Sequence, residues 1–502
     1  MFQFQEATLL VGLLTLDRDS SVPLPEQIYR STRRAILDGR LALGGRLPSS
    51  RSLATGLGVS RNTVNAAYEL LMAEGMIEVR PGSAPRVVDG GEGVGDLPGE
   101  LLPQASASEP ALSARGHAMA SNPWGASGRR RGGRLEPGTP ALDCFPQDAW
   151  ARALRRAARR LKGPELFYDR IPGYEPLREV LASYLVEERG LRASAERIIV
   201  LPSTQAALFM LASALTDPGD CVWLEDPGYL GARAAFQAAG LDIRPMPVDD
   251  EGADPRRMPD GPAPRLVYVT PSHQYPFGMR MPLHRRLMML ERVRACSGLV
   301  VEDDYDSEFL FEGRPLAAMQ GLGGEGDTVY LGTFSKTMLP GLRVAYMVVP
   351  PALAAPLARV QRVTGAFANV ATQAALAEFI ESGHYRAHLR RIREVYAQRG
   401  RGLAEALRAR LGNRIVAADP VGGVQIAVRF NMPCDDKAVA RRVNERAFGV
   451  AALSAYALSA KASGLVIGFA ALRDGEAETC AEAVADALDR ETGNAPAGHG
   501  VA

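Results

Sequence analysis

Short runs of β-branched and aliphatic residues alternate with longer Ala-, Leu- and Arg-rich stretches over most of the chain. Five of these runs are predicted strands: IIVL at 198–201, RLVYVT at 265–270, LVVEDDY at 299–305, DTVYLGT at 327–333 and AYMVVP at 345–350. Strands separated by helices need crossover connections, which favour a mostly parallel sheet with helices on both faces. We therefore expect one large α/β domain over residues 135–492, with a smaller lobe at its C-terminal end.

A different, helical pattern fills residues 21–88. Apolar side chains recur there at i, i+3, i+4 and i+7, which predicts a helix that starts after Ser60 and buries one face. The buried positions are Val64, Ala67, Tyr68 and Leu71. Ser60 is typical of a helix N-cap, so the polar residues that follow it lie at the exposed start of the helix.

A shorter helix is predicted just before this one. It begins near Arg51 with Ser49 or Ser50 as its cap, and the two glycines of the string TGLG end it in a turn. After the second helix, Met76–Val79 and Arg86–Val88 are predicted to pair as a β-hairpin. Two helices and a hairpin in this order predict a small α+β domain of the winged helix-turn-helix kind.

Residues 89–134 differ in composition from both flanking regions. Gly, Ser, Ala and Pro dominate, and no periodicity is sustained, so we expect a flexible linker. Trp124 is the exception, and it is a candidate docking point on a neighbouring domain. The last residues, 493–502, are predicted to be a disordered tail.

Charge changes this picture only locally. The 502-residue chain has a formal net charge of +1, which gives no global argument for nucleic acid. Residues 21–88, however, hold nine arginines against five acidic residues. This local excess supports DNA binding by the predicted winged helix, although an ordinary helical hairpin with a solvated polar face is the alternative.

Cysteine usage and hydropathy exclude several classes of protein. The five cysteines are scattered, odd in number and never in C-x-x-C spacing, which argues against a disulfide framework and a structural zinc site. A reducing cytoplasm is the expected compartment. No apolar run approaches the length of a membrane span, so we expect no membrane contact.

One lysine stands out as candidate chemistry. The chain has only four lysines, and Lys336 falls in the string GTFSKTMLPGLRVAY at 332–346, among hydroxyls and seven residues before Arg343. An amine in this setting suits a Schiff base with an aldehyde cofactor whose phosphate is held by the hydroxyls and the arginine. The alternative is a surface lysine on a loop.

Acidic residues gather at the end of a predicted strand, in the string VEDDYDSEF that ends at Phe309. The carboxyl ends of parallel strands are where α/β proteins bind ligands. One buried aspartate there could pair with a protonated pyridine nitrogen, and a tyrosine could hydrogen-bond a phenolic oxygen. Helix capping or a metal site are the alternatives, but no histidine is close in sequence.

The N-terminal string LPSSRSLATGLGVSRNTVNAAYELLMAEGMI resembles the winged helix of GntR-type bacterial regulators almost position by position. The wing departs from that family, because it reads RPGSAPRVV where a Gly-rich turn is usual. The resemblance implies contacts with double-stranded operator DNA from six residues: Arg46, Arg51, Ser60, Arg61, Asn62 and Thr63.

The large domain resembles the fold-type I aminotransferases, which use pyridoxal 5′-phosphate. The resemblance implies that Lys336 forms the internal aldimine, that Asp303 pairs with the pyridine nitrogen, and that Tyr305 donates to the cofactor's O3′. Other implied contacts are Thr333, Ser335, Arg343, Ser203, Thr204 and Gln205 to the phosphate, Tyr229 stacked on the ring, and Tyr168 to the partner subunit's phosphate. In TPSHQYPFG, at 270–278, His273 or Gln274 takes the place of the family's asparagine.

One expected residue is missing. Aminotransferases place an arginine before a late strand to clamp the substrate α-carboxylate, and Val466 occupies that position in the string GLVIGFA. Arg473 and Lys461 lie off the expected spacing. We therefore expect little or no transaminase turnover, whereas cofactor binding is retained.

The two halves together resemble the MocR family of bacterial transcription regulators. The resemblance implies a homodimeric regulator that binds operator DNA and senses pyridoxal phosphate, or an amine or amino-acid adduct of it. It also implies association with the nucleoid when the protein is bound to DNA. Two alternatives remain: an active aminotransferase with an accessory N-terminal domain, and a DNA-binding protein whose large domain only dimerises.

Overall fold

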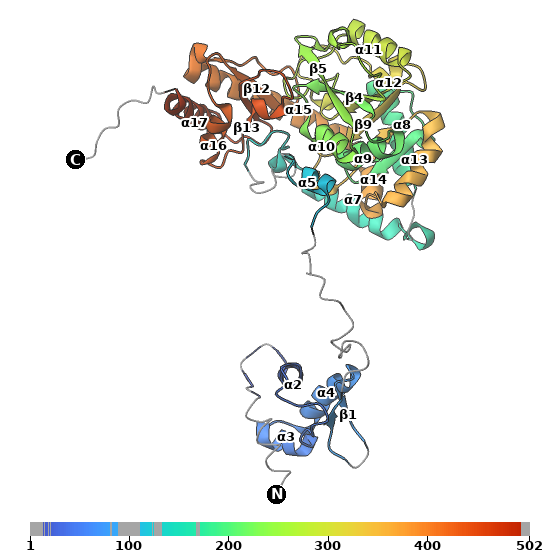
Figure 1. Ribbon diagram of the computed structural model, residues 1–502, viewed down its shortest axis with the longest axis vertical. Coiled ribbons are helices and arrows are strands. Elements are labelled where there is room, and N and C mark those ends of the chain that lie inside the picture. The colour runs from blue at the N-terminus through green and yellow to red at the C-terminus, as the bar shows by residue number, and fades with distance from the viewer. Residues whose placement is uncertain are drawn as a thin grey trace, which may run out of the picture. The chain divides into compact units, whose positions relative to one another are not determined.

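The computed structural model describes residues 14, 16–18, 20, 22–80, 83–88, 111–122, 124, 133–166 and 171–492. The chain divides into two compact units, Met1–Ala111 and Leu112–Ala502. Figure 1 traces both along the chain. No helix among the described residues is long and apolar enough to cross a membrane.

The first unit is a winged helix. Its helices are α2 (Leu24–Leu37), α3 (Ser50–Leu57) and α4 (Arg61–Ala73), and its wing pairs β1 (Ile77–Glu78) with β2 (Arg86–Val87) in antiparallel register. The four predicted positions on α4 are all buried, in a core shared with Ile28 of α2 and Leu53 of α3. Both helix caps follow the sequence pattern, with Ser49 at the start of α3 and Ser60 at the start of α4.

The turn between α3 and α4 depends on Gly58. Its φ of +64° lies in the left-handed region, where a side chain would be strained. This residue ends α3 and lets α4 begin only three positions later. The predicted helix-turn-helix is therefore present, with its second helix presenting an exposed polar start.

The second unit is built on an eight-stranded sheet with the order β3-β10-β9-β8-β7-β4-β5-β6. Neighbours from β9 through β5 run parallel, whereas β10 is antiparallel to both of its neighbours and β6 to β5. The strands are β3 (Ile198–Leu201), β4 (Cys221–Asp226), β5 (Asp242–Asp249), β6 (Gly252–Ala253), β7 (Leu266–Val269), β8 (Leu299–Asp304), β9 (Thr328–Thr333) and β10 (Ala345–Val348).

Helices cover both faces of this sheet (Figure 1). Alternate residues of a strand enter different cores: Leu266 and Tyr268 of β7 pack with α9 and α10, and Val267 and Val269 pack with α11. The helices of this layer are α7 (Gln147–Arg160), α8 (Glu175–Arg189), α9 (Thr204–Leu215), α10 (Leu230–Ala239), α11 (Leu283–Ala295), α12 (Met319–Leu322), α13 (Pro351–Thr364) and α14 (Val370–Glu381).

A smaller lobe follows, as predicted. Its four-stranded antiparallel sheet has the order β11-β12-β14-β13. The strands are β11 (Ile415–Val416), β12 (Gln425–Phe430), β13 (Ala451–Ala452) and β14 (Gly464–Gly468), and the helices are α15 (His384–Leu411), α16 (Asp436–Asn444) and α17 (Glu476–Glu491).

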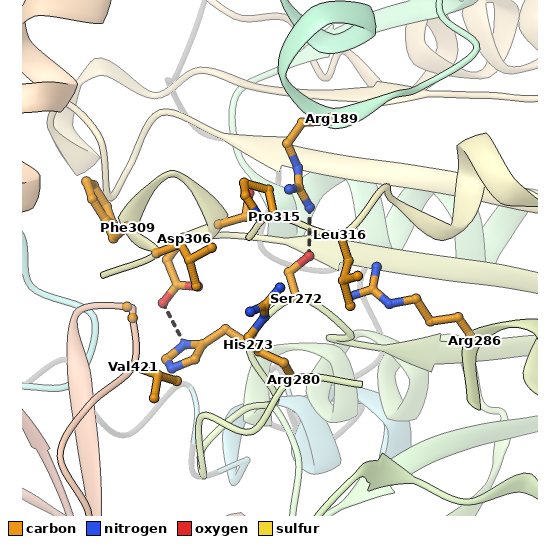
Figure 2. A pocket seen from close by; sticks show the side chains of 14 residues that line it. Arg189, Ser272, His273, Arg280, Arg286, Asp306, Phe309, Pro315, Leu316 and Val421 are labelled. Atoms are coloured by element: carbon orange, nitrogen blue, oxygen red, sulfur yellow. Dashed lines mark hydrogen bonds and ion pairs between the residues drawn. The ribbon is translucent and has the colours of Figure 1, made fainter. Parts of the chain in front are cut away.

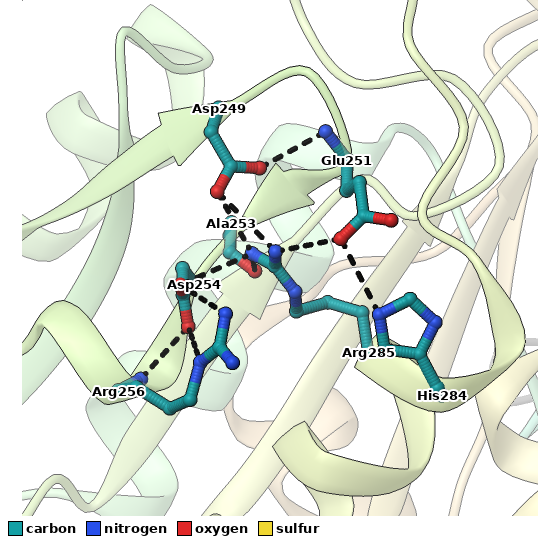
Figure 3. A network of polar contacts seen from close by, with 7 residues as sticks. All are labelled: Asp249, Glu251, Ala253, Asp254, Arg256, His284 and Arg285. Carbon is teal, nitrogen blue, oxygen red and sulfur yellow. Dashed lines mark hydrogen bonds and ion pairs between the residues drawn. The ribbon is translucent and has the colours of Figure 1, made fainter.

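The far edge of the large sheet is held by a buried arginine at the start of α11. Arg285 is 2% exposed, and its Nη2 atom lies 3.2 Å from Asp249 Oδ2 and 2.9 Å from Glu251 Oε2. Figure 3 shows these contacts together with that to Asp254. Because the three acids lie in and beside the β5–β6 hairpin, Arg285 links this edge of the sheet to helix α11.

Part of the predicted linker is ordered. Within 89–134, the structure describes α5 (Ala114–Ala120), which belongs to the second unit and packs against α10. Asn122 Nδ2 then donates to Gln237 Oε1 on α10 at 2.7 Å. Within the linker predicted to be mostly flexible, this segment packs on the α10 surface. Residues 89–110, 123, 125–132 and the predicted tail 493–502 lie outside the described residues.

Candidate functional site

Lys336 lies in the loop between β9 and β10, beside a segment about 200 residues earlier in the chain. Its Nζ donates a hydrogen bond to the carbonyl of Gly138 at 2.7 Å. Gly138 has a φ of +81°, where a side chain would be strained, and a Cβ there would lie 2.6 Å from Nζ. Burial lowers the pKa of Lys336, against the opposing effect of Asp306, Asp303 and Glu136. The shift favours the neutral amine, which is the nucleophilic form.

Asp303, at the end of β8, is a buried carboxylate with one oxygen free to accept a hydrogen bond. Its Oδ2 accepts a hydrogen bond from the Tyr268 hydroxyl at 2.6 Å, whereas its Oδ1 is buried and meets no hydrogen-bond donor among the described residues. Burial raises the pKa of Asp303 to about 7. A protonated ring nitrogen at Oδ1 would supply both the missing donor and a charge that favours the ionised carboxylate.

Tyr305 and His273 form one buried group with Asp306. The Tyr305 hydroxyl donates to the His273 carbonyl at 3.0 Å, and His273 Nδ1 lies 2.9 Å from Asp306 Oδ2. Gln274, the other candidate for the asparagine position, instead donates to the carbonyls of Pro227 and Tyr275. His273 is therefore the member of the pair that lies beside Tyr305. Gln274 instead links its own loop to the backbone at Pro227. Asp306 was not singled out from the sequence, although it belongs to the same acidic string.

A pocket opens beside the His273–Asp306 pair (Figure 2). Three arginines line it, and each already makes hydrogen bonds or an ion pair within the chain. Arg189 is paired with Asp304 and Ser272, and Arg286 donates to three backbone carbonyls. Arg280 donates to the Arg314 carbonyl at 2.6 Å. Lys336 does not line this pocket.

The predicted phosphate-binding residues come together at one end of three neighbouring strands, β3, β10 and β9. Strand register places Leu201, Ala345 and Thr333 in one row across β3, β10 and β9. The segments that follow β3 and β9 and the one that precedes β10 therefore leave the sheet at the same level. These segments carry Ser203, Thr204 and Gln205, then Thr333 and Ser335, and finally Arg343.

Local contacts fit an anion at this edge. Ser203 caps α9, with its Oγ accepting from Ala206 N at 3.1 Å, so the helix N-terminus faces the edge. Thr333 Oγ1 donates to Ser335 Oγ at 2.9 Å. Gln205 Oε1 is buried without a hydrogen-bond partner among the described residues, and Arg343 is exposed at a φ of +53°. The α9 N-terminus, the two hydroxyls and Arg343 therefore offer donors and a cation at these strand ends, which suits an anion, whereas the unpaired Gln205 Oε1 is an acceptor and does not.

Tyr229 lies at the start of α10 within an aromatic group. Its ring stacks on that of Tyr268 with centroids 6.5 Å apart, and Tyr275 meets it edge-on at 5.5 Å. Trp124 also meets it edge-on, at 5.2 Å. The predicted docking of Trp124 is confirmed, and its contact is with the tyrosine expected to stack on the cofactor ring.

The position of the missing arginine is fully apolar. Val466 is completely buried in β14 and packs with Leu453 and Tyr456. Lys461 and Arg473 are both exposed. Tyr168 lies outside the described residues, so its predicted role stays a prediction.

The DNA-facing candidates cluster around the start of α4. Ser60 Oγ accepts from Thr63 N at 3.1 Å, while Arg61 and Asn62 are exposed. Arg61 Nε reaches Ser50 Oγ at 3.2 Å, linking α4 to α3. Arg51 is exposed on α3, and Arg46 is exposed where it bridges the wing strand at Arg86. All six candidates therefore lie on α3, α4 or beside the wing.

Comparison with known proteins assigns both halves. Residues 24–87 match the model for bacterial regulatory proteins of the gntR family, and residues 138–484 match the model for aminotransferases of class I and II. The chain is 39% identical over 470 residues to the probable rhizopine catabolism regulatory protein MocR of Rhizobium meliloti, covering 92% of each chain. The chain belongs to the MocR family of transcription regulators.

A second relative agrees with this assignment. The pyridoxine biosynthesis transcriptional regulator PdxR of Corynebacterium glutamicum is 31% identical over 460 residues, which cover 91% of this chain and 94% of PdxR. The winged helix of this MocR-family member is thus a GntR-type module that binds operator DNA. Its family supports the regulator interpretation over that of an aminotransferase with an accessory domain.

Solved structures resemble the large domain. The kynurenine aminotransferase of Pyrococcus horikoshii, solved with PMP, has a TM-score of 0.65 at 26% identity over 71% of this chain and 90% of its own. The multiple substrate aminotransferase of Thermococcus profundus has a TM-score of 0.69 at 23% identity over 76% of this chain and 98% of its own, which shows the fold. The MocR-family chain therefore carries an aminotransferase fold of type I.

Proposed function

We propose that the large domain binds pyridoxal 5′-phosphate and uses it to sense a primary amine, and that this signal changes operator binding. Two observations carry the proposal. Burial shifts the Lys336 amine toward its neutral form, and the buried Oδ1 of Asp303 lacks a hydrogen-bond donor among the described residues. Asp303 lies at the C-terminal end of β8 and Lys336 follows the C-terminal end of β9. The two strands are parallel neighbours, so both residues lie at the same end of the strands.

Each part of the cofactor has residues that would hold it. Asp303 would accept from the ring nitrogen, Tyr305 would donate to the phenolic oxygen beside His273, and Tyr229 would lie against the ring. The phosphate would take Ser203, Thr204, Gln205, Thr333, Ser335 and Arg343. When bound, the cofactor supplies an aldehyde carbon that either Lys336 or an incoming primary amine can hold, with release of the other.

The same site lacks what transamination needs. An enzyme must orient its substrate so that the bond to be broken is aligned, and the family's clamp for the α-carboxylate is replaced by buried Val466. Lys461 and Arg473 are exposed, and the buried Val466 leaves that position apolar. A sensor needs only binding and a difference in affinity between two states, so this site suits a sensor.

The working unit in this proposal is a cytoplasmic homodimer that associates with the nucleoid when it is bound to DNA. Aminotransferase-like sites take a tyrosine from the neighbouring subunit, and Tyr168 stands at that position of the sequence. Two winged helices would then read two half-sites. The five cysteines are all free, which suits a reducing compartment.

A visible absorption spectrum of the purified protein tests cofactor attachment. Lys336→Ala should abolish the visible band, because it removes the Nζ that would form the imine. Lys461→Ala, which removes an exposed lysine, should keep the band. Borohydride reduction followed by peptide mapping should label Lys336, and labelling of another lysine would overturn the assignment. Robust multiple-turnover transamination of common amino acids would favour the enzyme alternative.

A further inference from the structure

The pocket of Figure 2 is separate from the proposed cofactor site. It lies between the loops that follow β7 and β8 and the segment of the small lobe that precedes β12. Among the described residues that line it, His273 is the only one implied for the cofactor. The enclosed part of the pocket is small and one side is open to solvent, so a ligand would place a polar head inside and the rest of its chain in the mouth.

Two buried oxygen atoms of this pocket lack partners. Asp306 is 1% exposed, and its Oδ2 lies 2.9 Å from His273 Nδ1, whereas its Oδ1 makes no hydrogen bond to a described residue. The Oγ atom of Ser307, the next residue, is also buried without a partner in the described part of the chain. Buried polar groups are nearly always hydrogen-bonded in folded proteins. An ionised carboxylate oxygen only accepts, so the group that satisfies Asp306 Oδ1 must be a donor.

Arg280 supplies a positive charge at the same pocket. Its Nη2 atom donates to the carbonyl of Arg314 at 2.6 Å, and the guanidinium forms no ion pair with any described acid. The other two arginines of the pocket differ from it. Arg189 is paired with Asp304 at 2.7 Å, and Arg286 uses all three of its nitrogen atoms on backbone carbonyls. A guanidinium that keeps N–H groups and has no acid partner is suited to a carboxylate.

Aliphatic side chains form another part of the lining. Leu310 and Leu316 are half-buried, and Val421 is 39% exposed. Their remaining apolar area is available to a ligand, and covering it is favourable. The pocket therefore offers an acceptor, a cation and an apolar wall together.

We propose that this pocket is a second, non-covalent ligand site, specific for aliphatic α-amino acids in their zwitterionic form. The ammonium group donates to Asp306 Oδ1 and Ser307 Oγ, and the carboxylate accepts from Arg280. The side chain lies in the mouth against Leu316 and Val421. No bond to the cofactor forms, so the inference goes beyond the proposed function and does not depend on it. An amine or an acid alone leaves one charged group of the site unmatched.

Three probes with one carbon skeleton separate the two charges. They are L-leucine, 3-methylbutylamine, which lacks the carboxylate, and 4-methylpentanoate, which lacks the amine. Each is titrated by calorimetry into the full-length protein after borohydride reduction, which fixes any cofactor to its lysine and prevents exchange with the probe. L-leucine should bind about tenfold more tightly than either analogue, because each analogue loses one charged hydrogen-bonding match.

Arg280→Gln should lower the affinity for L-leucine about tenfold and leave that for 3-methylbutylamine unchanged, because only the carboxylate uses the guanidinium. A distorted pocket would weaken both probes, so this difference separates a lost contact from lost structure. Arg314→Gln is the matched control. It removes an exposed arginine side chain that does not line the pocket, and it should bind all three probes as wild type does.

The outcomes decide the inference without reference to the proposed function. Failure of L-leucine to bind the reduced protein overturns it, as does equal affinity for L-leucine and 3-methylbutylamine. An Arg280→Gln variant that binds L-leucine as tightly as wild type also overturns it. Preference for L-leucine that is lost in Arg280→Gln and kept in Arg314→Gln supports it. A protein without a cofactor band at Lys336 would contradict the proposed function alone, because binding in this pocket needs no cofactor.

Discussion

The pKa of Lys336 depends on charges from two separate parts of the chain. Burial lowers its pKa, and Asp306, Asp303 and Glu136 oppose this. Two of these acids, Asp303 and Asp306, belong to the acidic string that begins in β8 and that the sequence pattern highlighted. Glu136 lies about 200 residues earlier, and no local pattern marks it, because its role comes only from tertiary packing of the segment that contains Gly138.

The balance at Lys336 predicts a pH effect. Glu136→Gln removes one opposing carboxylate, so the pKa of Lys336 should fall further below its usual range. Because attachment of the cofactor needs the neutral amine, half-maximal attachment should move to lower pH than in wild type. Titrating the apoprotein with pyridoxal phosphate at a series of pH values, read by the visible band, measures this shift. A midpoint that moves to higher pH would contradict the assigned electrostatics.

At the scale of elements, five strands of the large sheet were predicted, whereas β4, whose sequence CVWLED is fully buried, and the half-buried β5 were not. The five runs named from the sequence correspond to β3, β7, β8, β9 and β10. Strand β5 was missed because its sequence, DIRPMPVD, is only half-buried and contains Pro245 and Pro247. Proline lacks the N–H that a central strand needs, so this pattern fits a position near the sheet edge, where only β6 lies beyond β5.

The helix that begins after Ser60 carries the DNA-binding prediction. If Arg61 contacts a base, Arg61→Ala should weaken operator binding by about 1–3 kcal/mol. If it contacts a phosphate, the slope of log affinity against log salt concentration should become shallower by about one. Arg30→Ala removes the same charge from α2, where Arg30 pairs with Glu26 at 2.8 Å, and should have little effect. Affinity measured across a salt series distinguishes the cases. An Arg61→Ala variant with wild-type affinity and slope would remove Arg61 from the interface.

At the scale of the whole molecule, the family and both folds could be predicted from two independent motif sets. The ordered contact of the linker with the large domain could not. Its sequence lacks periodicity, and α5 is stabilised by packing on α10 rather than by an apolar face of its own.

Assembly is the first prediction at this scale. The proposed contribution of Tyr168 to a neighbouring site requires a homodimer when cofactor is bound. Sedimentation of the holoprotein at micromolar concentration should give twice the 53.8 kDa mass of the chain. A monomer with cofactor attached would show that one chain completes the site by itself.

Coupling between cofactor state and operator binding is the central claim, and operator affinity tests it most directly. The dissociation constant for the operator is measured for the apoprotein, for the holoprotein and for the holoprotein with a primary amine, alongside Lys336→Ala and the control Lys461→Ala. We expect at least one transition to change the affinity of wild type and of Lys461→Ala by about fivefold or more, as is typical of allosteric coupling. Lys336→Ala should bind the operator with one affinity throughout. Equal affinities in every state of the wild-type protein would contradict the account.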